Sequence, residues 1–192
     1  ETKVVSELGN MSIVELLLQG KTTTPADLVK DLPGDNEAKA ETIDNNLQHE
    51  IVKKMSSNPV YYGKLSEMLK KIIMQRKVAA MSYQEYLKQV VEMAEAILHP
   101  EDNGDYPDEV KNSAARRALF DYFEEDLELT VDVDGAIRIA IRPAWKKNRQ
   151  KQQKIRLAIY EKLLLHSYSK DKAEEETNQV FDIAQRQEEY DA

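Results

Sequence analysis

The stretch SYQEYLKQVVEMAEAIL, residues 82–98, decides the fold class of this chain. Ser82 and Glu85 stand three residues apart, the spacing of a capping box, in which two side chains satisfy backbone N–H groups at a helix start. Behind them, apolar residues recur every three or four positions, as they do on the buried face of a helix. These residues are Tyr86, Leu87, Val90, Val91, Ala94, Ile97 and Leu98. We therefore expect a helix that packs one face into a core.

The same pattern recurs along the chain and predicts an all-α protein. Further helix starts are expected at Ser12, Thr24 and Asn58, the last followed by Pro59 at a position where a missing N–H costs nothing. Only six glycines occur in 192 residues, which also favours helix. We expect a single compact domain of about eight helices, with residues 1–39 as a helical lead-in and 40–192 as the main helical domain.

One segment leaves its secondary structure open. LELTVDVDGAIRIAI, residues 127–141, alternates apolar and polar residues around Asp134-Gly135, which is typical of a β-hairpin. A helix is the alternative, because a helical period also gathers apolar residues on one face. That face would hold Leu129, Val133, Ala136, Ile137, Ala140 and Ile141. Gly135 would cost such a helix about 1 kcal/mol relative to Ala, so the residues alone slightly favour the hairpin.

Composition excludes several classes of protein. The formal net charge is −8, so any contact with nucleic acid must be local. The chain has no cysteine, which excludes disulfides and thiolate metal sites and favours a reducing, cytoplasmic location. No apolar run approaches the length of a membrane span, so no membrane partner is expected. Because the chain begins with Glu1 rather than Met, we expect it to be a piece of a larger protein.

Two short motifs imitate catalytic sites. Gly20-Lys21-Thr22 matches the end of a phosphate-binding loop, but the position that needs the first glycine is Glu15, whose charge repels phosphate. The segment 107–111 contains the Pro-Asp and Glu-x-Lys pieces of metal-dependent nucleases. Its acids fall within one turn, whereas that chemistry needs carboxylates converging from separate elements. We expect no catalytic and no cofactor-binding residues, and hence no enzyme activity in this chain.

No metal site is expected either. Residues 130–141 imitate a calcium loop, yet Thr130 and Ile141 occupy positions where two main ligands belong. The three histidines, at 49, 99 and 166, stand far apart and show no Asp or Glu partner at ligand spacing. We expect each of them to be a surface or partly packed residue.

The stretch RPAWKKNRQKQQKIR, residues 142–156, contains seven Lys or Arg and no acid, which leaves the remaining chain at −15. A solvated helix face from about Asn148 is one interpretation; contact with phosphate or with an acidic protein is the other. Trp145 is expected to pack rather than stack on a base. Reversing the charges of Lys146, Lys147 and Arg149 should leave the fold intact. The candidate DNA or partner contacts are Arg142, Lys146, Lys147, Arg149, Lys151 and Lys154.

Several segments in series resemble one known family. NPVYYGKLSEMLKKIIMQRKVAAMSYQEYLKQVVEMAEAI (58–97), ALFDYFEEDLELTVDVDGAIR (118–138) and VFDIAQRQEEY (180–190) are similar to the helical C-terminal region of the R (restriction) subunit of type I restriction enzymes. Trp145, Asn148, Lys151 and Ile155 resemble a Trp-x-x-Asn helix start of that region. The resemblance covers roughly residues 40–192, and several matches in order are more specific than one.

The resemblance implies a function. R subunits are bacterial cytoplasmic proteins with a nuclease domain and two motor domains that use ATP and Mg²⁺, and their tail assembles with a methyltransferase made of modification and specificity subunits. Since this chain carries none of the nuclease or motor motifs, it would be the assembly end of such a subunit, without a cofactor of its own. DNA would be a partner in the assembled complex. The resemblance also favours a helix at residues 129–141.

Overall fold

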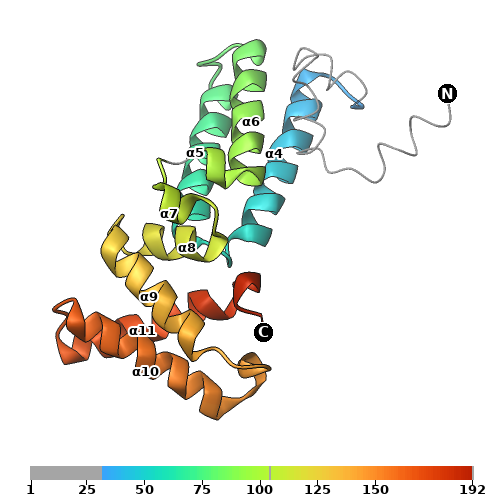
Figure 1. The fold of residues 1–192 in the computed structure, drawn as a ribbon. Coiled ribbons are helices and arrows are strands. Elements are labelled where there is room, and N and C mark those ends of the chain that lie inside the picture. The colour runs from blue at the N-terminus through green and yellow to red at the C-terminus, as the bar shows by residue number, and fades with distance from the viewer. Residues whose placement is uncertain (1–31, 104, 192) are drawn as a thin grey trace. The chain divides into compact units, whose positions relative to one another are not determined.

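The computed structural model describes residues 32–103 and 105–191 (Figure 1). These residues form eight α-helices and three short 3₁₀ turns, and the described part of the chain contains no strand. The prediction of an all-α protein is confirmed. By their contacts the residues group into two compact units: residues 32–55 with 62–103, and residues 56–61 with 105–191. The sequence-derived helix starts at Ser12 and Thr24 lie outside the described residues.

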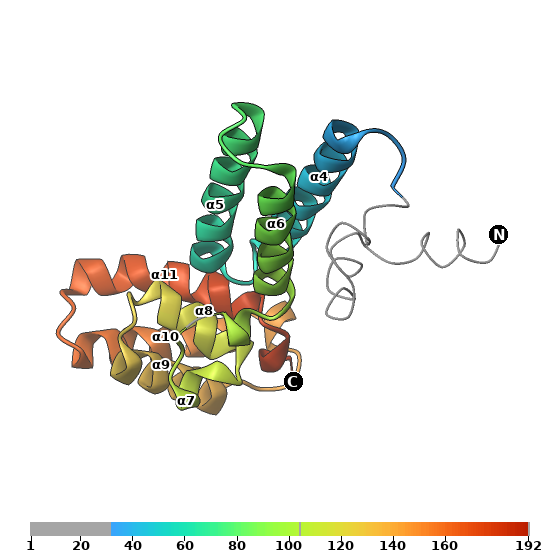
Figure 2. The ribbon, with the colours of Figure 1, turned by 90° about the horizontal axis from the view of Figure 1, so that it is seen from above.

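The first unit contains α4 (Asn36–Lys54), most of α5 (Pro59–Lys77), α6 (Tyr83–Leu98) and the 3₁₀ turn η2 (Pro100–Asp102). In both views α6 runs between α4 and α5 (Figures 1 and 2). The capping box at α6 is present, with Ser82 Oγ accepting from the Glu85 N–H at 3.2 Å. The expected domain boundary between residues 39 and 40 falls inside α4.

A buried polar cluster connects α4, α5 and α6. Tyr86 Oη donates to Asp44 Oδ1 at 2.8 Å and to the Ala40 carbonyl at 3.0 Å. Arg76 donates to Asp44 Oδ2 at 2.8 Å and stacks 5.4 Å above the Tyr86 ring. Because each side chain comes from a different helix, the cluster specifies which faces meet, in addition to the apolar packing around it.

The second unit contains the remaining helices. They are α7 (Asp108–Lys111), α8 (Ala114–Tyr122), α9 (Leu127–Ala140), η3 (Trp145–Lys147), α10 (Arg149–Leu165), α11 (Lys170–Gln185) and η4 (Glu188–Tyr190). α10 packs against both α9 and α11, and Figure 2 shows α10 and α11 side by side. The core centres on Trp145 and Phe181, whose rings meet edge to face at 5.8 Å between centroids.

Residues 127–140 form the helix α9, with Ile141 as its C-cap, and not a hairpin. Asp126 caps the helix, since its Oδ1 accepts from the Leu129 N–H at 3.0 Å. The helical face expected from the sequence does enter the core, with Leu129, Val133 and Ile137 all buried. The alternating pattern favoured a hairpin because Asp134 was interpreted as a turn residue. In the structure, Asp134 is a buried member of that same helical face.

The buried Asp134 side chain connects α9 to α8 and to the C-terminal turn. Its Oδ2 accepts from Arg116 Nε at 2.7 Å, and its Oδ1 accepts from Arg138 Nε at 2.8 Å and from Tyr190 Oη at 2.7 Å. Glu189, beside Tyr190, accepts from the Ala114 N–H at 2.5 Å at the start of α8. These bonds hold the chain's last described residues against the first turn of α8.

None of the described helices combines the length and apolar character that crossing a bilayer requires.

Candidate anion-binding surface at the start of α10

The basic stretch 142–156 covers the turn η3 and the first two turns of α10. As expected from the sequence, the helix begins after Asn148, whose Oδ1 accepts from the Lys151 N–H at 3.1 Å. Ile155 and Ile159 face inward and are fully buried. The opposite face of the helix therefore carries the positive charges.

Trp145 anchors this surface and takes no part in it directly. Its side chain is 1% exposed, and its Nε1 donates to the Tyr190 carbonyl at 2.6 Å. The prediction that Trp145 packs into the core is confirmed. Because the indole lies at the centre of the core, it holds the backbone of η3 in place and so positions the lysines on either side of it.

Three of the six candidate cations bind the protein's own backbone. Arg142 donates to the carbonyls of Ile139 and Ile141, at 2.7 and 2.6 Å, which lie at the C-terminal end of α9. Lys151 Nζ donates to the Pro143 carbonyl at 2.6 Å. These bonds satisfy carbonyl groups that a helix end and a turn leave without partners.

Lys146 is the third cation with an internal role. Its ammonium donates to the Gln187 carbonyl at 3.1 Å, pairs with Asp191 and lies 5.7 Å from the centre of the Trp145 ring. Reversing its charge would place a carboxylate beside Asp191 and would disturb the C-terminal turn. The expectation that Lys146 can be reversed without effect on the fold is therefore revised.

The other three candidates, Lys147, Arg149 and Lys154, keep their charges exposed. None of them forms an ion pair with a side chain in the described part of the chain. Lys147 and Arg149 line a hollow of about 470 Å³ together with Lys146, Gln152, Gln153 and Arg156. A concave surface with several cations suits an anion, since the field of each charge adds at the same place.

Arg156 was not among the candidates from the sequence. Its guanidinium lies 3.8 Å above the Phe181 ring and donates to Asn178 Oδ1 at 2.6 Å. The signal was available, because Arg156 follows Arg149 by seven residues, which is two turns on the same helix face. The stacking on Phe181 depends on α11 and could not be read from the α10 sequence.

The described residues include two of the three motifs that imitate catalytic or metal sites. The phosphate-loop mimic at Gly20 lies outside the described residues. Asp108 and Glu109 form the first turn of the four-residue helix α7. In the calcium mimic, Thr130 and Asp134 are buried in α9, and the Asp134 carboxylate is held by two arginines.

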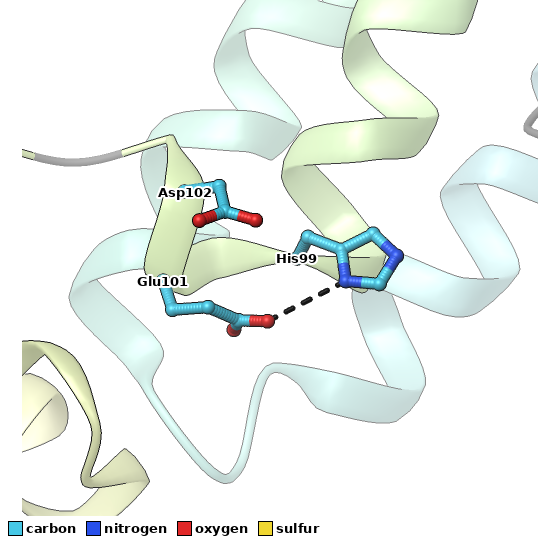
Figure 3. A group of neighbouring side chains, drawn as sticks. All are labelled: His99, Glu101 and Asp102. Atoms are coloured by element: carbon cyan, nitrogen blue, oxygen red, sulfur yellow. Dashed lines mark hydrogen bonds and ion pairs between the residues drawn. The ribbon is translucent and has the colours of Figure 1, made fainter. Parts of the chain in front are cut away.

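The expectation that the histidines lack acidic partners is wrong for two of them. His99 Nδ1 lies 3.4 Å from Glu101 Oε1, and Asp102 extends from the same turn, η2 (Figure 3). One ligand atom from each of these three side chains lies within 4.8 Å of the others. His99 is the N-cap of η2, so the three residues belong to one 3₁₀ turn and its cap. His166 Nε2 lies 3.1 Å from Asp132 Oδ2, across the α9–α10 contact.

The chain matches no protein-family model, no curated protein and no solved structure with which it was compared. The resemblance to R-subunit tails therefore rests on the motifs quoted above.

Proposed function

We propose that this chain is the non-catalytic assembly domain of a type I restriction R subunit, acting in the bacterial cytoplasm. It would dock the ATP-dependent, DNA-translocating endonuclease onto the methyltransferase core during restriction of unmodified DNA. ATP and Mg²⁺ would serve the parent subunit's other domains. The serial motifs over residues 40–192 support the family.

One structural observation carries the docking role. Lys147 and Arg149 present free positive charge in a hollow, and Lys154 is exposed on α10 outside its lining, on a chain whose formal net charge is −8. Cations that make no internal pair contribute nothing evident to the fold, whereas Lys146 and Lys151 do. A free cationic surface on an acidic protein is suited to an acidic partner, because charge complementarity speeds encounter and selects the binding face.

An auxiliary DNA-contacting module is the second candidate, using the same stretch 142–156. The hollow that favours it contains two arginines, Arg149 and Arg156, and guanidinium groups pair readily with phosphate oxygens. Phosphate binding releases counterions, so the affinity for duplex DNA would fall with salt at a log–log slope of about −0.9 per contact.

The test compares the chain's affinity for the purified methyltransferase with its affinity for duplex DNA. The variant is Lys147→Glu/Arg149→Glu/Lys154→Glu, which avoids the structurally engaged Lys146. The matched control reverses three exposed lysines of α5, Lys64, Lys71 and Lys77, with the same change of charge.

We expect the α10 variant to bind the methyltransferase about tenfold more weakly or worse, and the α5 control to bind as the native chain does. Loss of DNA binding with methyltransferase binding retained would instead support the DNA-contacting module. Wild-type affinity of the α10 variant for both partners would refute both roles for this surface.

A further inference from the structure

The basic hollow continues into a second depression on the same unit. A groove of about 590 Å³ lies between α10 and α11, and it shares Gln153 and Arg156 with the hollow. The two together form one trough along α10, which begins at Lys147 and ends at Tyr160 and Glu174.

The near end of the trough is basic and partly held in place. Lys147 and Arg149 line it without internal ion pairs among the described residues. Arg156 is fixed by its stacking on Phe181 and its bond to Asn178. Asn178 is its single hydrogen-bond acceptor among the described residues, so most of its five N–H groups stay available to a ligand. A guanidinium already held in one position loses less entropy when it binds.

The far end of the trough is apolar and then acidic. Leu157 is 56% exposed although it is a large aliphatic residue in the middle of α10, and it lines the groove with Tyr160. The opposite wall comes from α11 and includes Glu174. α11 as a whole carries five acidic residues against two lysines. The trough therefore changes from cationic through apolar to anionic along its length.

The length of the trough determines how many residues of an extended polypeptide it can hold. Arg149 and Tyr160 are eleven residues apart on α10, a distance of about 16 Å at the helical rise per residue. An extended polypeptide covers that distance with about five residues. An acidic residue at the near end would then stand three or four positions from an apolar residue beside Leu157.

This gradient argues against a nucleic acid as the occupant. A DNA strand carries a phosphate about every 3.4 Å, so its charge is uniform along the trough. Phosphates that reached the far end would meet the carboxylate of Glu174. A polypeptide can place acids at one end and an apolar side chain at the other.

We propose that the trough binds an extended segment of a partner protein in which acidic residues lie three to four positions from a large aliphatic or aromatic residue. The inference deepens the proposed function and rests on it only for the source of the segment, which would be the methyltransferase. The chemistry of the segment follows from the trough alone.

The probe is the fluorescein-labelled peptide Asp-Glu-Asp-Gly-Ser-Leu-Phe, together with the reversed sequence, since the trough does not define chain direction. The first control peptide replaces the acids with Lys, and the second replaces Leu-Phe with Gly-Gly. A labelled 12-base-pair duplex is the nucleic-acid probe. Binding to the whole 192-residue chain is measured by fluorescence anisotropy.

Two variants address the two ends of the trough. Arg149→Glu is matched by Lys71→Glu on α5. Leu157→Ser is matched by Leu165→Ser, at the last residue of the same helix and 75% exposed. All four side chains are exposed, so circular dichroism should show four folded proteins.

We expect one orientation of the acidic–apolar peptide to bind about tenfold more tightly than either control peptide. Arg149→Glu and Leu157→Ser should each weaken it about fivefold or more, and their matched controls should not. Absence of peptide binding, binding insensitive to Leu157→Ser, or a duplex that binds more tightly with the same variant dependence would each overturn the proposal.

The methyltransferase assay separates this inference from the proposed function. If the chain binds the methyltransferase and both trough variants bind it equally well, the trough is not the docking site and the proposed function stands. If the chain does not bind the methyltransferase but the peptide results hold, the trough stands and the proposed function fails.

Discussion

The side chain of Asp134 is charged although it has no access to solvent. Burial alone would raise the pKa of this carboxyl, but hydrogen bonds from Arg138, Arg116 and Tyr190 hold the pKa below its ordinary value. The ionised form is therefore the stable one in the folded protein. The first unit repeats the arrangement, with Asp44 between Arg76 and Tyr86. In both units, the described residues thus include a buried acid held by an arginine that stacks on a tyrosine.

Replacing Asp134 by Asn should destabilise the protein by about 2 kcal/mol. The change removes one partner of two arginines, and the loss stays below that of a fully buried pair because Arg116 and Arg138 retain some access to water. The loss in the free energy of unfolding is measured by urea unfolding, with Trp145 fluorescence as the signal. Asp132→Asn, two positions earlier and half-exposed, is the control and should cost less than about 1 kcal/mol. Equal losses for the two variants would contradict the role given to Asp134.

The same carboxyl should make the protein sensitive to acid. Glu189 also has a lowered pKa: burial opposes the ionised form, but bonds from Ser113, Arg138 and the first N–H groups of α8 outweigh it. Because the folded-state pKa values lie below the ordinary values of 3.8 and 4.5, the stabilisation is complete above about pH 5 and is lost as the pH falls through them.

The measurement is the free energy of unfolding between pH 6 and pH 3, a range that spans the ordinary carboxyl values. We expect a decline below about pH 5 that is shallower in Asp134→Asn. Parallel declines for the native chain and the variant would show that Asp134 does not contribute.

At the scale of one element, α9 shows how a helix can carry a strand-like sequence. Its polar positions include the cap Asp126, the buried Asp134 and the half-exposed Asp132, which pairs with Lys162 of α10. The helix therefore uses these three acids as a cap, a buried acceptor and an ion-pair partner. Gly135 does not require a special conformation, since its φ is not positive and an added Cβ would meet nothing within 4 Å.

Gly135→Ala should therefore stabilise the protein by up to about 1 kcal/mol, because alanine loses less backbone entropy in a helix. Thermal unfolding measures the effect. Gly34→Ala is the contrasting variant: Gly34 has a φ of +98°, and its added Cβ would lie 2.7 Å from Ala38 Cβ. It should lower the melting temperature. A lower melting temperature for Gly135→Ala as well would mean that α9 does not tolerate a side chain at this position.

At the scale of the whole molecule, the charge is unevenly distributed. The basic stretch lies within a unit whose α11 is acidic, and only part of its charge is free for a partner. The acids of α7, which imitate a nuclease motif, lie together in one turn. A magnesium ion for hydrolysis needs carboxylates held from separate directions, and a single turn does not supply them.

We expect the isolated chain to show neither ATPase nor Mg²⁺-dependent nuclease activity. Phosphate release and cleavage of supercoiled DNA are the measurements, made on successive purification fractions. Cleavage that follows the protein through purification and disappears in Asp108→Ala would contradict this expectation. The control is Asp171→Ala, an exposed acid in the first turn of α11.

The sequence alone predicted much of the fold, because helix formation depends on near neighbours. The capping box at Ser82, the start of α5 after Asn58 and the start of α10 after Asn148 each involve residues three positions apart. The stripe through Tyr86, Val90 and Ile97 likewise needs only the helical period. These features were predicted correctly because no distant residue is needed to form them.

Only the tertiary structure decided the rest. The helix at residues 127–140 depends on arginines from α8 and α9 and on Tyr190 near the chain end, whose hydrogen bonds stabilise the buried Asp134. The division of the basic stretch into internally bound and exposed cations also depends on the tertiary structure. Whether a lysine is free or bound depends on which carbonyl or carboxylate the fold brings beside it, as Asp191 is brought to Lys146 while Lys147 is left exposed. Such pairings join residues far apart in the chain, and local sequence does not specify their distance.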